Sequence, residues 1–156
     1  MNIFSLLRPE TVIPNMEASD KAEVLERLVS SLEGQVSNGE LEKIREAVFE
    51  REKIMSTGVG KGLAIPHGKA AGIEQTYAAF GMLSDAVDYE AIDDEPVNMV
   101  FLLVGPQASN SLHIKMLSRI SRLMNNSEFR DRLRKCETAD AIIEQFKDEE
   151  HVSFNG

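Results

Sequence analysis

Cysteine is nearly absent from this chain of 156 residues, and no long apolar run occurs in it. The single cysteine, Cys136, excludes an internal disulfide framework and fits a reducing cytosol. The best apolar run, residues 99–104, suits a buried strand and is far too short to span a membrane. The amino terminus lacks a basic region followed by an apolar stretch, so we expect no signal peptide. These absences predict a cytoplasmic protein without membrane insertion.

Positive charge is also scarce, since the formal net charge is −9. This balance disfavours nucleic acids and anionic membranes as partners and favours a basic protein. Residues 51–70 go against it, with four basic residues and one acid, Glu52, and no further acid before Glu74. A basic, glycine-rich segment is suited to receive an anion. A solvated loop would have the same composition, so charge alone leaves both interpretations open.

The spacing of apolar residues predicts an α/β protein built around one sheet. We expect helices at residues 19–34, 38–52, 109–123, 127–135 and 138–147. We expect strands at residues 63–65, 77–83 and 97–104. The length is that of one domain, which we place at residues 1–150, followed by a flexible tail at residues 151–156.

Three histidines could carry chemistry, and two of them have a suggestive context. His67 follows a predicted strand and lies between a rigid proline, Pro66, and Gly68, which lets a bulky group approach the backbone. His113 lies in the first turn of a predicted helix, where free N–H groups and the helix dipole suit an anion. His151 lies in the polar tail, where we expect no role. A histidine taken singly is more often structural than catalytic, but the first two accompany the basic segment.

Several other chemistries do not fit the sequence. The segment from Gly58 to Gly62 is not a Walker A loop, and Leu63 breaks a dinucleotide-binding pattern. Gly-x-Ser-x-Gly, the nucleophile elbow of serine hydrolases, does not occur. A zinc site from His67 and His113 would need further ligands, and no cysteine or acid neighbours either residue. We therefore expect no metal and no cofactor.

Residues 51–68 resemble the signature of the type-2 enzyme IIA domains, the fructose/mannitol class, of the phosphoenolpyruvate-dependent phosphotransferase system. The segment reads REKIMSTGVGKGLAIPHG. The resemblance continues through residues 91–97 (AIDDEPV), Gly105-Pro106 and residues 112–117 (LHIKML), and covers roughly residues 3–147. It implies a single mixed β-sheet flanked by helices on both faces, which agrees with the α/β organisation above.

The resemblance also implies the roles of site residues. His67 would be the phosphoryl acceptor, most simply through Nε2, with His113 as the second active-site histidine and Arg51 as the active-site arginine. A histidine is largely unprotonated at neutral pH and needs no separate base. Phosphoryl transfer then needs in-line positioning and donors for the phosphoryl oxygens. We expect these donors from Arg51, His113 and the loop that contains the following residues: Ser56, Thr57, Gly58 and Gly60.

Two branches of this family remain possible, and both would use His67. Residues 91–97 look like the nitrogen-regulatory IIA proteins, which accept phosphate from an HPr-like carrier and bind regulatory target proteins. The alternative is a sugar-specific IIA that passes phosphate to a IIB protein. A binding module that never turns over is disfavoured by the intact His67, Arg51 and His113. We expect a shallow apolar docking surface around the histidine, with these candidates: Ile54, Met55, Val59, Leu63 and Met82.

Overall fold

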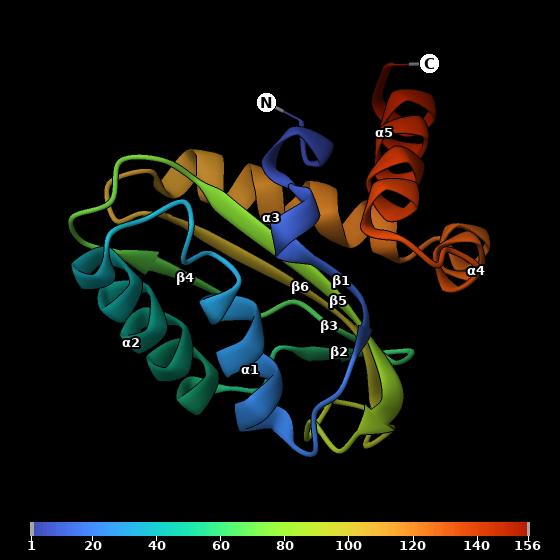
Figure 1. The fold of residues 1–156 in the computed structure, drawn as a ribbon, viewed down its shortest axis with the longest axis horizontal. Coiled ribbons are helices and arrows are strands. Elements are labelled where there is room, and N and C mark those ends of the chain that lie inside the picture. The colour runs from blue at the N-terminus through green and yellow to red at the C-terminus, as the bar shows by residue number, and fades with distance from the viewer. Residues whose placement is uncertain (1, 156) are drawn as a thin grey trace.

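The computed structural model describes residues 2–155, which form a mixed β-sheet with helices on both faces (Figure 1). The helices are α1 (Lys21–Ser30), α2 (Asn38–Ile54), α3 (Asn110–Met124), α4 (Ser127–Arg134) and α5 (Ala139–Asn155). The strands are β1 (Val12–Met16), β2 (Gly58–Gly60), β3 (Leu63–Ala64), β4 (His67–Ala70), β5 (Tyr77–Val87) and β6 (Val97–Pro106). The predicted fold class is therefore confirmed.

The first two helices begin at side chains that cap them. Asp20 accepts a hydrogen bond from the N–H of Glu23 (2.9 Å), which satisfies one free donor at the start of α1. Ser37 and Glu40 form a reciprocal capping box at the start of α2. Both helices begin where the sequence predicts, because capping is a local interaction.

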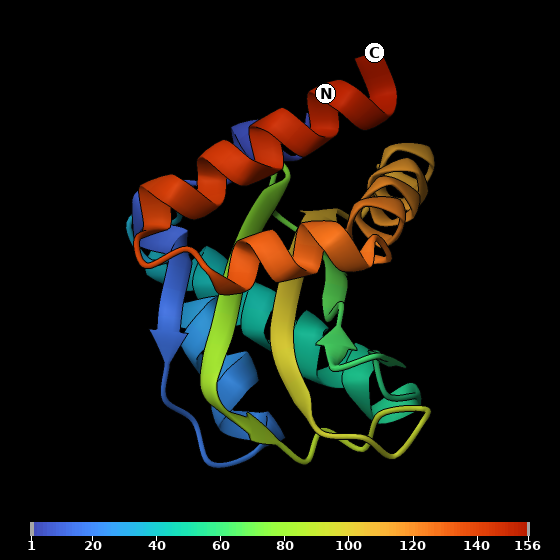
Figure 2. The ribbon, with the colours of Figure 1, turned by 90° about the vertical axis from the view of Figure 1, so that its right-hand side faces the viewer.

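The sheet has the strand order β1-β5-β6-β3-β2, and β4 also pairs with β6. Strand β6 is central, since it runs antiparallel to β5 and parallel to both β3 and β4. Figure 2 shows β1, β5 and β6 side by side, with helices in front of and behind the strands. An apolar strand such as β6 is expected in the middle of a sheet that is covered on both faces.

Side chains of β6 alternate between two hydrophobic cores. Val100, Leu102 and Val104 belong to the core beneath α1 and α2. Met99, Phe101 and Leu103 belong to the core beneath α3, α4 and α5. This alternation of the β6 side chains follows from the two-residue period of a strand.

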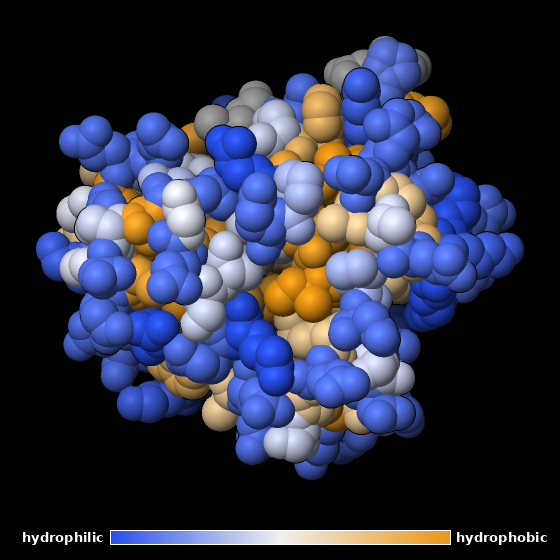
Figure 3. All heavy atoms as spheres, in the orientation of Figure 1, coloured by the Kyte–Doolittle hydropathy of each residue, from blue (hydrophilic) through white to orange (hydrophobic). Residues whose placement is uncertain are grey.

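On the face covered by α1 and α2, hydrophilic residues form most of the outline, and hydrophobic ones show near the middle, over the sheet (Figure 3).

Several elements differ from the sequence-based expectations. Strands β1 and β2 were not predicted, and β4 begins at His67, immediately after Pro66. Helix α5, expected to end near residue 147, continues to Asn155 because Glu150 is buried and bonded to the amino-terminal segment. Residues 151–155 are thus helical, and the division into a domain at residues 1–150 and a flexible tail at residues 151–156 stays a prediction.

Candidate active site

His67 lies at the break between two short strands that both pair with β6. Pro66 separates β3 from β4, and the register places His67 beside Leu103. The side chain is half-buried, and the residue is the first of β4. Parallel pairing of both strands with β6 therefore holds the histidine backbone at a defined position.

The His67 ring is oriented by a backbone carbonyl. Its Nδ1 lies 2.8 Å from the oxygen of Ile65, and a carbonyl only accepts, so Nδ1 carries the proton in this contact. In the neutral ring Nε2 then holds the free electron pair. Burial lowers the pKa of His67, and the charge of Arg51 lowers it further, although the bond to Ile65 acts in the opposite direction. A neutral imidazole with a free Nε2 is the nucleophilic form.

His113 lies in the first turn of α3 and faces the same pocket as His67. The two ring centroids are 5.7 Å apart. Gly105 leaves room for the buried ring, since a side-chain carbon there would come within 3.2 Å of His113 Nδ1. That nitrogen has no hydrogen-bond partner among residues 2–155. Burial, the neighbouring His67 and Lys69 lower the pKa of His113 to about 4.

Arg51 lies in the last turn of α2, between two pockets that share His67 and Leu117. Its Nη1 donates to the carbonyl oxygen of Met55 (2.8 Å), just past the end of the helix. The guanidinium has further N–H groups for an anion held near His67. The structure thus brings together the three residues predicted to act on a phosphoryl group, whereas His151 lies exposed on α5.

The loop predicted to bind phosphoryl oxygens already uses several of its donors. Thr57 donates both its N–H (2.8 Å) and its hydroxyl to the carboxylate of Glu52. The N–H of Gly58 is bonded to Ser56 Oγ (3.1 Å). Gly60 lies near the carboxylate of Asp93, outside both pockets that His67 lines. Binding of phosphoryl oxygens by this loop therefore stays a prediction.

The basic character of this segment is stronger at the surface than the sequence indicates. Its single acid, Glu52, is buried and paired with Lys21 on α1 at 2.8 Å. Within residues 2–155, no cluster of three or more His, Cys, Asp or Glu side chains is arranged to hold a metal ion. His67 and His113 form only a pair.

Exposed apolar side chains border the site. Three predicted docking residues are exposed: Ile54, Met55 and Val59. The other two, Leu63 and Met82, are in the core, so that prediction is wrong for them. Ile114 and Ile92 are also exposed and each lines one of the two pockets beside His67, although no sequence pattern selected them. Their exposure depends on which side chains the fold turns outward.

None of the helices within residues 2–155 combines the length and the apolar character that crossing a bilayer requires.

Comparisons with known proteins show to which family this chain is similar. A family model described as "Phosphoenolpyruvate-dependent sugar phosphotransferase system, EIIA 2" matches residues 5–149. A nitrogen regulatory protein of Bradyrhizobium diazoefficiens is 34% identical over 142 residues, which cover 91% of this chain and 92% of that protein. The fructose-specific EIIABC component of Bacillus subtilis is 37% identical over 144 residues, which cover 92% of this chain but only 23% of that protein.

A solved structure shows the same fold. The crystal structure of the nitrogen regulatory protein IIA-Ntr from Neisseria meningitidis matches with a TM-score of 0.86 and 30% sequence identity. The match covers 92% of this chain and 98% of that chain.

Proposed function

Since this chain belongs to the EIIA 2 family of the phosphoenolpyruvate-dependent sugar phosphotransferase system, we propose that His67 is the residue that carries the phosphoryl group. The observation that supports this proposal best is the contact of His67 Nδ1 with the Ile65 carbonyl, which leaves Nε2 as the nucleophile. The phosphoryl donor would be an HPr-like phosphocarrier protein in the cytoplasm.

The transfer needs no metal or cofactor from this chain. The Nε2 electron pair attacks phosphorus, a phosphorus–nitrogen bond forms, and the bond between phosphorus and the donor breaks with its electron pair returning to the donor. Arg51 would bind phosphoryl oxygens, and His113 would donate a ring N–H to them. An anion near these groups favours their protonated forms, so phosphorylation should raise the pKa of His113.

The phosphorylated protein would act as a nitrogen-regulatory IIA protein that binds target proteins according to its phosphorylation state. The identity to the Bradyrhizobium nitrogen regulatory protein (34%) and to the Neisseria IIA-Ntr structure (30%) supports this branch. The alternative is a sugar-specific IIA that passes phosphate to a IIB protein, which the identity to the Bacillus fructose component supports. The exposed Ile54, Met55 and Ile114 would contact the partner in either case.

A labelling experiment tests the role of His67. The protein is incubated with phosphoenolpyruvate, enzyme I and the HPr-like carrier, and acid-labile phosphate is mapped. Because only Nε2 of His67 is expected to bond to phosphorus, His67→Ala should reduce labelling to background. The control is His151→Ala, which removes an exposed histidine on α5 and should label like the wild type. Full labelling of a folded His67→Ala variant would contradict the proposal.

A second assay separates the two branches. The labelled protein is mixed with a IIB protein of the fructose/mannitol class, and loss of phosphate from His67 is followed. A regulator should keep most of its label under conditions in which a sugar-specific IIA loses it.

A further inference from the structure

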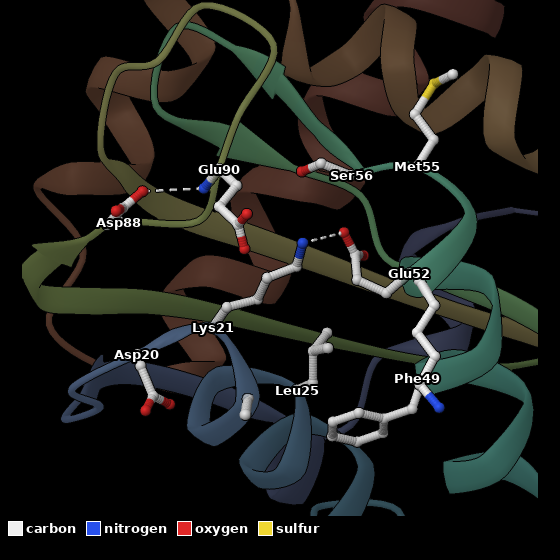
Figure 4. A pocket seen from close by; sticks show the side chains of 11 residues that line it. Asp20, Lys21, Leu25, Phe49, Glu52, Met55, Ser56, Asp88 and Glu90 are labelled. Carbon is white, nitrogen blue, oxygen red and sulfur yellow. Dashed lines mark hydrogen bonds and ion pairs between the residues drawn. The ribbon is translucent and has the colours of Figure 1, made fainter.

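Glu52 is a buried carboxylate near His67, but it lines neither of the two pockets that His67 lines. It lies in a separate hollow between α1, α2 and residues 88–90, where Lys21 and Glu52 point toward each other (Figure 4). Lys21 Nζ is 2.8 Å from the carboxylate, and the Tyr89 hydroxyl donates to it at 3.2 Å. Thr57 supplies two further donors, its N–H and its hydroxyl.

A buried ion pair is weak evidence for stability, because apolar residues of similar volume often hold two helices equally well. Packing of α1 against α2 therefore does not by itself explain why a charged pair, Glu52 and Lys21, stands at this position. What an apolar side chain could not do is accept both hydrogen bonds from Thr57. The loop after α2 needs this acceptor, since Thr57 is itself buried and its N–H would otherwise lack a partner.

A series of hydrogen bonds connects this carboxylate with the His67 ring. Glu52 accepts from the N–H of Thr57 at 2.8 Å. The carbonyl of Thr57 accepts from the N–H of Ile65 at 2.9 Å. The carbonyl of Ile65 accepts from His67 Nδ1 at 2.8 Å. Thr57 and Ile65 each make one contact through the N–H and the next through the carbonyl oxygen, so each contact restrains the residue that makes the next one.

From this geometry we propose that Glu52 is a positioning residue for phosphoryl transfer, which orients the His67 ring and selects its Nδ1–H tautomer through Thr57 and Ile65. The inference rests on the proposed function of His67. Met55, whose carbonyl accepts from Arg51, lies between Glu52 at the end of α2 and Thr57, so the bond from Thr57 to Glu52 also restrains this contact of Arg51. Loss of the carboxylate would loosen both contacts without removing a group that touches the phosphoryl oxygens.

The test compares Glu52→Gln with a matched control, Glu26→Gln. Glu26 on α1 pairs with Arg45 on α2, so the control removes another ion pair between the same two helices. Phosphorylation by the HPr-like carrier is measured as kcat and KM. In parallel, ¹⁵N NMR of the unphosphorylated proteins reports which ring nitrogen of His67 carries the proton, independently of any transfer.

We expect Glu52→Gln to lower kcat about 10- to 100-fold, the range found when the hydrogen-bonding partners that orient metal-binding histidines are removed. KM should change little, because Glu52 is buried and does not face a docking partner. The His67 spectrum should show a smaller fraction of the Nδ1–H tautomer. Glu26→Gln should leave kcat, KM and the spectrum as in the wild type.

Equal kcat values and spectra for the two variants would overturn the proposal. If Glu52→Gln does not fold, Tyr89→Phe provides the same comparison with a smaller expected effect, because it removes a hydroxyl that contacts both Glu52 and Thr57. If the wild-type protein takes up no phosphate, the proposed function fails. The NMR comparison still decides then whether Glu52 orients His67, and an unchanged spectrum would reject that as well.

Discussion

At the scale of single residues, the proposed site contains two imidazoles that are close together and disfavour the charged form. The rings of His67 and His113 have centroids 5.7 Å apart, and burial lowers the pKa of both side chains. Lys69 acts on His113 in the same direction. Two neutral imidazoles beside an arginine do not repel the negative charge of a phosphoryl group, whereas two carboxylates at the same positions would repel it.

The lowered pKa of His113 predicts a pH-dependent stability. The ring is neutral in the fold down to about pH 4, whereas the unfolded chain takes up the proton near the ordinary value of 6.5. The unfolded state therefore binds more protons between these values, and stability falls as pH drops through this window. The variant His113→Gln cannot gain this proton. From pH 7 to pH 5 the wild type should lose roughly 1–2 kcal/mol more unfolding free energy than the variant.

Urea titrations of both proteins at the two pH values measure this difference. Groups other than His67, which neighbours His113, titrate alike in both proteins, so their contributions cancel in the comparison. If both proteins lost the same unfolding free energy between the two pH values, burial would not disfavour the charged form of His113.

At the scale of elements, the position of His67 depends on close contact between β4 and α2. Gly68 follows His67 in β4, and a side-chain carbon at Gly68 would lie 3.1 Å from the backbone of Ala47 in α2. Backbone atoms cannot move aside as a flexible side chain can. A glycine is therefore required here by the approach of the helix, as well as by the approach of a partner that the sequence indicated.

This contact predicts the effect of Gly68→Ala. The added methyl group must push β4 away from α2, which should destabilise the protein by about 1–3 kcal/mol and slow phosphorylation. Gly39→Ala is the matched control, since a carbon there meets nothing within 4 Å. In the first turn of α2, alanine should be neutral or stabilising by up to about 1 kcal/mol. Thermal unfolding of both variants measures the contrast, and equal melting temperatures would refute it.

At the scale of the whole molecule, α5 connects the end of the described chain with its beginning. Glu150 is 1% exposed and accepts hydrogen bonds from the backbone N–H groups of Ile3 (2.6 Å) and Phe4 (3.0 Å). It also pairs with Arg119 of α3 at 2.7 Å. These contacts join the amino-terminal segment, α3 and α5 on one face of the sheet.

The charge of this carboxylate should therefore matter for stability but not for chemistry. Glu150→Gln leaves Arg119 without its partner and should lower the unfolding free energy by about 2–3 kcal/mol. Glu144→Gln changes an exposed residue of the same helix and should have no measurable effect. Phosphorylation at a temperature where both variants are folded should match the wild type. A stability of Glu150→Gln equal to that of Glu144→Gln would mean that the buried carboxylate contributes nothing net.

The sequence by itself determined the elements whose causes are local, together with the family resemblance and the candidates for the site. Side-chain caps placed the starts of α1 and α2, the apolar run marked β6, and the segment from Arg51 to Gly68 carried the family resemblance. His67 and His113 stood out by their contexts, and the family resemblance added Arg51 and implied the three roles, which stay a prediction.

Only the tertiary structure decided the features that depend on distant partners. Residues 148–150 are charged and look like a loose end, but Glu150 is buried because Ile3 and Phe4 supply donors for it. Leu63 and Ile92 are both apolar, yet the sheet buries the first and a loop exposes the second. Glu52 looked like one acid in a basic segment until the fold brought Lys21 and Thr57 to it. Burial and pairing are set by residues far apart in the chain, and no local pattern encodes them.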